Sequence, residues 1–176
     1  RATVDPHLWL DPENAGRIAK IVAAALGEVD PEGAATYARN ADDLGDRIEA
    51  LERELRATLA PVRRAPYVVF HDAYQYFERR YGLNAIGSVA VDPERAPGAR
   101  RLTEIRARIR DGGAACVFSE PQFRPRVLTT IVEGSGARLA LLDPLGADLA
   151  PGPEAYFELM RRLARSLADC LAPSGG

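Results

Sequence analysis

The chain contains two histidines in 176 residues, and each stands where a metal ligand is expected. His7 lies in a loop bracketed by Pro6 and Pro12, and His71 directly follows the apolar run at residues 67–70. Imidazole is a common zinc ligand, so a histidine placed in each of these positions predicts metal binding. Taken singly, His7 could be a surface loop residue and His71 a hydrogen-bonded histidine at a strand end. Two imidazoles do not complete a zinc site, so further ligands must come from elsewhere.

Acidic residues follow the other apolar runs of the chain. Because ligands gather at the carboxyl ends of parallel strands, these positions are candidate ligands or supports for an imidazole. A second reading stays open, since Asp followed by Pro often opens a turn or caps a helix, and this would explain several of them, as well as Asp5 and Asp11, without metal. The candidates after the runs are Asp72, Asp92, Glu120 and Asp143.

The elements that must position these residues begin with two helices. Apolar residues recur at helical spacing between residues 11 and 28. Asp30 and Pro31 then form a capping signal, and Gly45 is the single interruption before Pro61. The second helix is therefore expected to run for roughly 28 residues, or about 40 Å.

After Pro66 the pattern changes to short apolar runs that alternate with helical segments. Apolar runs bounded by Gly, Pro or Asp predict strands buried on both faces. We therefore expect an α/β fold, with a parallel-type sheet covered by helices and preceded by a long rigid linker helix. The expected segments are 67–70, 73–81, 85–91, 99–111, 114–118, 125–134, 138–142 and 154–171.

Composition excludes several functional classes. The 23 basic and 25 acidic residues give a net charge of −2 without long blocks of one sign, which argues against nucleic acid as a partner. No apolar run approaches the ~20 residues of a membrane-spanning helix, and no signal peptide is recognisable. Cys116 and Cys170 are either buried free thiols or a disulfide, and the disulfide requires an oxidising compartment.

Enzymatic motifs are lacking in the sequence. It has no nucleophile elbow, phosphate-binding loop, dinucleotide-binding turn or His-Glu-x-x-His helix. A zinc hydrolase would need a general base, and Glu120 is the one candidate with a suitable place.

Four sequence segments together resemble the periplasmic or lipid-anchored zinc-binding proteins of ABC importers, a group that also contains manganese binders. In that group two α/β lobes are joined by one long rigid helix, and the metal lies in the cleft between them. The segments are Asp5-Pro6-His7-Leu8-Trp9-Leu10-Asp11-Pro12, Phe70-His71-Asp72-Ala73-Tyr74-Gln75-Tyr76-Phe77, Phe118-Ser119-Glu120-Pro121-Gln122-Phe123 and Leu142-Asp143-Pro144-Leu145-Gly146.

The resemblance implies that His7, His71 and Asp143 are the metal ligands. It implies that Glu120 and Asp72 contact these ligands without binding the metal. Manganese-type members carry glutamate at the position of His71, and an imidazole there favours Zn²⁺. The implied function is capture of zinc in the cleft and delivery to an ABC permease, without catalysis. The alternatives are a manganese- or iron-binding protein or an adhesin on the same scaffold, and less readily a zinc-dependent hydrolase. The resemblance further implies a Cys116–Cys170 disulfide and a periplasmic location.

The sequence departs from this group because nothing before Arg1 corresponds to most of an N-terminal lobe, which supplies a further histidine. The expected organisation is an N-lobe remnant at residues 1–29, the linker helix at 30–61, the C-terminal α/β lobe at 62–172 and a disordered tail at 173–176. Without that lobe, Val4, Leu8, Trp9 and Leu10 would have no core to bury them. We therefore expect residues 1–28 to be mobile, rearranged or covered by a second copy of the chain.

Overall fold

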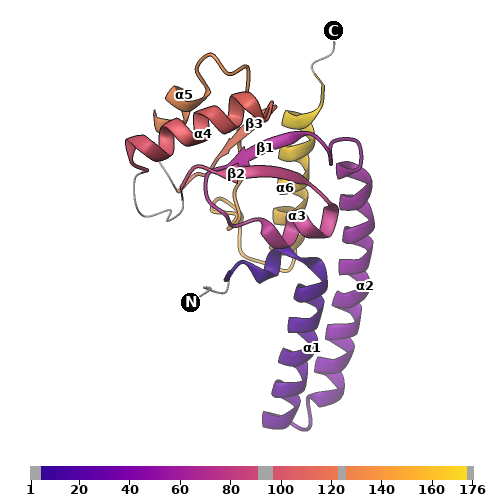
Figure 1. The fold of residues 1–176 in the computed structure, drawn as a ribbon. Coiled ribbons are helices and arrows are strands. Elements are labelled where there is room, and N and C mark those ends of the chain that lie inside the picture. Colours follow the sequence, from indigo (N-terminus) through magenta and orange to yellow (C-terminus); the bar gives the residue numbers. More distant parts are fainter. Residues whose placement is uncertain (1–4, 91–96, 123–125, 174–176) are drawn as a thin grey trace.

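A helical hairpin and an α/β lobe make up the fold in a computed structural model that describes residues 5–90, 97–122 and 126–173 (Figure 1). The hairpin consists of α1 and α2, and the lower part of it extends away from the lobe. The elements are η1 (Leu8–Leu10), α1 (Pro12–Val29), α2 (Ala34–Leu59), β1 (Pro66–Val69), α3 (Gln75–Tyr81), β2 (Asn84–Ser88), α4 (Ala99–Asp111), β3 (Cys116–Ser119), α5 (Arg126–Val132), β4 (Arg138–Leu141) and α6 (Ala155–Leu171).

The long helix α2 begins three residues after Pro31, later than the capping signal predicts. Asp30 accepts a hydrogen bond from the Gly33 amide at 3.2 Å and another from the Tyr37 hydroxyl at 2.7 Å. Its carboxylate therefore stabilises the turn between the helices, and Gly33 takes the N-cap position of α2. The resulting 26-residue helix is about 39 Å long.

The four strands form one parallel sheet in the order β2-β1-β3-β4. Side chains alternate between the two faces, so Tyr67 and Val69 of β1 join the core beneath α2, α3 and α6. Val68 belongs instead to the second core, which includes Ile105 of α4 and Ile131 of α5. Burial on both faces explains why the inner strands β1 and β3 are almost entirely apolar. The parallel sheet flanked by helices confirms the predicted α/β class.

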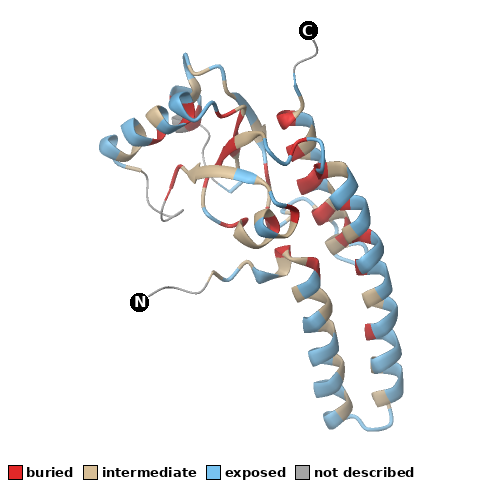
Figure 2. Ribbon diagram, turned by 45° about the vertical axis from the view of Figure 1, so that its right-hand side comes forward, coloured by how far each residue is buried: buried red, intermediate tan, exposed pale blue. Residues whose placement is uncertain are grey.

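The core is concentrated in the lobe, whereas the far part of the hairpin is mostly exposed (Figure 2). On α2 the buried apolar residues from Ile48 onward face α6 and the sheet. Helix α1 buries only its first residue, Pro12, and its larger apolar side chains are exposed. These exposed residues are Ile18, Ile21, Val22, Leu26 and Val29.

The segment before α1 packs on the lobe, contrary to the expectation that its apolar residues would lack a core. Leu10 is completely buried in the main core cluster, and Trp9 packs against the same cluster. That expectation is therefore wrong for Leu10, while Leu8 remains 37% exposed. Val4 lies outside the described residues.

Other expectations concern the end of β2 or residues that the structure does not describe. Strand β2 ends at Ser88, although the apolar run continues to Val91. Asp92 and the expected disordered tail from residue 174 onward lie outside the described residues. Among the described residues, no helix is both long and apolar enough to cross a membrane.

Candidate metal site

Two histidines from distant parts of the sequence meet at the carboxyl edge of the sheet. The ring centroids of His7 and His71 are 5.3 Å apart and the rings are inclined at 61°. The two side chains are 17% and 12% exposed, respectively, so both are largely withdrawn from solvent. This spacing brings the two imidazoles together in the way that the sequence analysis expects of a shared metal site.

Each imidazole is held by a carboxylate through the same ring nitrogen. Nδ1 of His7 lies 2.6 Å from Oδ1 of Asp5, and Nδ1 of His71 lies 2.7 Å from Oε1 of Glu120. The Glu120 side chain is 1% exposed and that of Asp5 is 8% exposed. Metal-binding histidines are commonly oriented by such contacts to the second ring nitrogen. In His7 this contact makes Nε2 the ring nitrogen that could face a cation.

Adjacent strands position the His71 and Glu120 pair. His71 follows β1 and Glu120 follows β3, and these strands are hydrogen-bonded neighbours in the parallel sheet. Their carboxyl ends therefore emerge side by side, which places the two side chains within hydrogen-bonding distance. That Glu120 supports the metal ligands without binding the metal itself stays a prediction.

The segment carrying His7 is held on the lobe by hydrogen bonds from aromatic side chains. Tyr76 of α3 donates its hydroxyl to the Asp5 carbonyl at 3.3 Å. Trp9 donates its indole N–H to the Pro144 carbonyl at 3.2 Å, and Tyr156 of α6 donates to the Trp9 carbonyl at 3.0 Å. The loop after β4 and two helices thus fix the backbone around His7.

Asp11 adds an ionic contact at the end of this segment. It caps α1 by accepting the Glu13 amide at 3.0 Å, and it binds the Arg80 guanidinium at 2.7 and 3.0 Å. Both side chains are largely buried, at 17% and 21% exposure. The capping reading of Asp11 is therefore confirmed, and the same carboxylate joins α1 to α3.

Asp143, the third expected ligand, is engaged in its own loop. Its carboxylate accepts the Leu145 amide at 3.0 Å, the Ala147 amide at 2.6 Å and the Gln122 side-chain amide at 3.0 Å. Burial alone would raise the pKa of Asp143, but these hydrogen bonds outweigh it and hold the pKa below its ordinary value. Asp143 is therefore a carboxylate at neutral pH. Its expected role in opening a turn is confirmed, and its role as a ligand stays a prediction.

Asp143 and the histidines are connected through their neighbours. The buried Tyr74 hydroxyl donates to the Leu142 carbonyl at 2.8 Å, and the Tyr74 ring lies 6.4 Å from that of His71. The Pro144 carbonyl is the acceptor of the Trp9 indole. Within the described ranges, no group of three or more His, Cys, Asp and Glu side chains is arranged to hold a metal ion. The structure thus brings the two histidines together, but it does not add Asp143 to them.

Asp72, the other residue expected to support the ligands, is exposed. It lines a polar cavity of about 370 Å³ beside β2, together with Glu78, Arg101 and Arg108. Its predicted role as a residue that supports the metal ligands stays a prediction.

Glu78, in the same cavity, has a raised pKa. Burial raises the pKa of Glu78 to about 7, and the charge of Asp72 adds to this shift. The Tyr67 hydroxyl opposes the shift by donating a hydrogen bond to Glu78.

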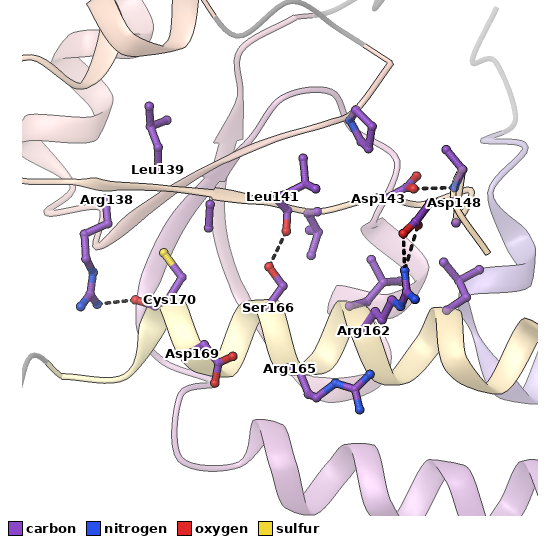
Figure 3. A pocket seen from close by; sticks show the side chains of 17 residues that line it. Arg138, Leu139, Leu141, Asp143, Asp148, Arg162, Arg165, Ser166, Asp169 and Cys170 are labelled. Carbon is purple, nitrogen blue, oxygen red and sulfur yellow. Dashed lines mark hydrogen bonds and ion pairs between the residues drawn. The ribbon is translucent and has the colours of Figure 1, made fainter.

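A larger groove of about 830 Å³ runs between β4 and α6 (Figure 3). Asp143 lines one end of it, whereas neither histidine contributes to it. Two of the arginines that line it have partners within the chain: Arg162 binds Asp148 at 2.8 Å, and Arg138 donates to the Cys170 carbonyl. The groove is therefore separate from the histidine pair.

The two cysteines form a disulfide between β3 and the end of α6. Cys116 is the first residue of β3 and Cys170 is the penultimate residue of α6. The pair thus joins the sheet to the last helix at the edge opposite to Glu120.

Sequence reasoning missed Asp5 as a partner of His7. The Asp5-Pro6 pair matches a turn signal, and the turn exists, because Asp5 also accepts the His7 amide at 3.0 Å. The spacing of two residues between an aspartate and a histidine is the signal from which the contact to the ring could have been suspected.

The chain matches one family over nearly its whole length. The model of the family described as "ZnuA: Zinc-uptake complex component A periplasmic" matches residues 1–170. The chain belongs to this family. It is 54% identical to the high-affinity zinc uptake system protein ZnuA of Brucella suis over 168 residues. This match covers 96% of this chain and 50% of the Brucella protein. This ZnuA family member thus spans about half the length of the curated relatives it matches.

Solved structures agree with the family assignment. The laminin-binding protein Lmb of Streptococcus agalactiae, described as a bifunctional protein with adhesin and metal-transporting activity, is 31% identical with a TM-score of 0.83. The match covers 96% of this chain and 65% of Lmb. A zinc-bound deletion mutant of ZnuA is 29% identical with the same TM-score of 0.83, and the match covers 99% of this chain and 64% of the mutant. The ZnuA-type fold is therefore shown over nearly the whole chain.

Proposed function

We propose that this chain binds Zn²⁺ with His7 and His71, and that Asp143 completes the set of protein ligands. The observation that carries the proposal is the pair of imidazoles with ring centroids 5.3 Å apart, each held at Nδ1 by a buried carboxylate. Imidazole nitrogen and carboxylate oxygen are preferred zinc ligands, and the nitrogen-rich set favours zinc over manganese.

Binding by all three residues requires Asp143 to exchange some of its present contacts for the cation. The hydrogen bonds from Gln122 and two backbone amides keep it ionised, which is the state that a ligand needs. One carboxylate oxygen can retain amide hydrogen bonds while the other binds metal.

We further propose that in the periplasm the ion is handed to an ABC permease, which membership of the zinc-uptake family supports. The disulfide supports an oxidising compartment. On this proposal zinc is cargo, and no reaction is carried out on it. Glu120, the one candidate for the general base of a hydrolase, is in contact with His71, which supports a role in binding.

Zinc titration against a competing chelator tests the proposal. Replacing His7 or His71 with Ala should weaken zinc binding by at least about 100-fold, or about 2.7 kcal/mol, because each removes one of few ligands. Asp143→Asn should weaken it less, since the amide oxygen remains a poor ligand. Asp111→Asn, at the exposed far end of α4, is the matched control and should have no effect. Unchanged affinity after both histidines are replaced would refute the proposal.

Cover by a second copy of the chain was one of three expectations for residues 1–28, and it stays a prediction that the exposed apolar side chains of α1 support. A second copy of the chain would give twice the monomer mass in solution. Light scattering checks this directly, and a monomer mass at concentrations above about 100 µM, with α1 folded, would rule out a dimer through this surface.

A further inference from the structure

Asp5 makes three contacts that together fix the position of His7. Its Oδ1 atom lies 2.6 Å from Nδ1 of His7 and accepts the backbone amide of the same residue at 3.0 Å. Its own carbonyl accepts the Tyr76 hydroxyl at 3.3 Å. The side chain is 8% exposed. A residue bound to both the backbone and the ring of His7, and anchored to α3, can set the direction in which that ring points.

The contact also determines which ring nitrogen carries the proton. A carboxylate can only accept hydrogen bonds, so a neutral His7 must carry its proton on Nδ1 to make this bond. The lone pair is then on Nε2, which is free to bind a cation. Without Asp5, the ring could adopt either tautomer and would have to give up the wrong one before binding metal.

The second carboxylate oxygen of Asp5, Oδ2, is placed where a cation bound to His7 would compensate its negative charge. Among the described residues, Oδ2 is buried and has no hydrogen-bond partner. A buried carboxylate oxygen without a partner costs free energy, and a dication on the adjacent imidazole would offset that cost. Glu120 likewise contacts Nδ1 of His71, so a carboxylate accompanies each of the two imidazoles.

We propose that Asp5 is the positioning residue for His7: it fixes the Nδ1-protonated tautomer, orients Nε2 toward zinc and contributes compensating charge. The zinc part of this proposal rests on the proposed function, whereas the tautomer part does not. Asp5 with His7 and Glu120 with His71 are then two carboxylate–imidazole pairs of the same kind. The two pairs come from distant segments of the chain and meet at the carboxyl ends of the strands.

The competing explanation is that Asp5 only stabilises the turn through the His7 amide. The two roles predict different results, because a turn residue has no effect on the protonation of a ring that remains in place. Serine can replace aspartate as a turn acceptor, so Asp5→Ser keeps the turn and removes the carboxylate. Asp5→Asn keeps an oxygen acceptor for both contacts and removes only the charge.

The test is long-range ¹H–¹⁵N correlation NMR of the zinc-free chain at about pH 8, where an ordinary imidazole is neutral. With two histidines in the sequence, each ring can be assigned by replacing the other. We expect both rings to be protonated on Nδ1. Asp5→Ala and Asp5→Ser should shift His7 toward the Nε2-protonated form and leave His71 unchanged, while Asp5→Asn should retain the Nδ1 form. Glu120→Gln is the matched control, and it should leave His7 unchanged.

Zinc competition on the same variants gives the second measurement. Asp5→Ala and Asp5→Ser should weaken zinc binding by about 10- to 100-fold, and Asp5→Asn by less. The proposal is overturned if His7 carries its proton on Nε2 in the unaltered chain, or if Asp5→Ser leaves both the tautomer and the affinity unchanged. A tautomer change in a chain that does not bind zinc would refute the proposed function while leaving the positioning of His7 by Asp5 intact.

Discussion

At the scale of single residues, Glu78 gives the fold a stability that depends on pH. Its pKa is raised to about 7, chiefly by burial. The folded state therefore holds a proton that the unfolded chain, with an ordinary carboxyl group, has already lost above about pH 4.5. Protonated Glu78 contributes fully at low pH, and its contribution is lost as the pH rises through about 7.

Replacing Glu78 with Gln removes this dependence. We expect Glu78→Gln to be more stable than the unaltered protein by about 1–3 kcal/mol above pH 7, and to match it closely near pH 4. Urea unfolding at a series of pH values measures the difference. Glu49→Gln, at an exposed position of α2, is the control and should follow the unaltered curve. A constant difference between Glu78→Gln and the unaltered protein at all pH values would contradict the explanation.

A site residue could be predicted from the sequence when its residue type and position had one plausible role, and not when they had several. His7 and His71 were predictable because imidazole is scarce in this chain and each position suits a ligand. The Asp5 contact was hidden because an Asp-Pro pair has a sufficient explanation as a turn. Asp143 shows that the two readings are compatible, since a carboxylate that caps a loop remains available to a cation.

At the scale of elements, η1 anchors the His7 segment through one buried leucine. Leu10 is 0% exposed and Leu8 is 37% exposed, although both lie in the same turn. We expect Leu10→Ala to lower the free energy of unfolding by about 2–4 kcal/mol, because it leaves a cavity in the main core. Leu8→Ala should cost less than about 1 kcal/mol. Equal effects in urea unfolding would show that the segment does not belong to the cooperative core.

The long helix α2 contains a glycine that packing does not require. Nothing lies within 4 Å of a Cβ atom built on Gly45, so Gly45→Ala should stabilise the protein by about 0.5–1 kcal/mol through helix propensity. Gly33→Ala is the contrasting variant, since its Cβ would lie 2.7 Å from the Tyr37 ring and collide with Asp30. Thermal unfolding should show opposite shifts for the two. Destabilisation by Gly45→Ala would indicate a contact made by this face.

The positions of helices and strands were predictable wherever the apolar residues recurred at either helical or strand spacing. The ends of several elements were not predictable. Helix α4 begins and ends at the predicted residues. The start of α2 was displaced because Asp30 binds Gly33 and Tyr37 to form a turn. Strand β2 ends at Ser88, and Val89 and Ala90 are apolar beyond its end because they pack in the second core. These choices depend on partners that are distant in sequence or on competing local hydrogen bonds.

At the scale of the whole molecule, the histidine pair and the disulfide lie at opposite edges of one sheet. Cys116 begins β3 and Glu120 follows the end of the same strand, so the four residues of β3 separate the two features. The sequence pattern predicted a parallel sheet and therefore which residues share an edge. It did not predict that residues 5–11 would pack on the lobe, because that depends on Tyr76, Tyr156 and Arg80 from three distant positions.

Reduction of the disulfide separates stability from metal binding. The bond closes a loop of 54 residues in sequence separation, so its loss should lower the free energy of unfolding by about 2–4 kcal/mol. The zinc affinity of the folded protein should be unchanged, because neither imidazole nor its carboxylate partner contacts the cysteines in the described structure. Urea unfolding and zinc competition, each with and without reductant, measure the two quantities. Cys116→Ala combined with Cys170→Ala controls for reductant binding zinc, and a fall in affinity in this double variant would show that β3 couples the two edges of the sheet.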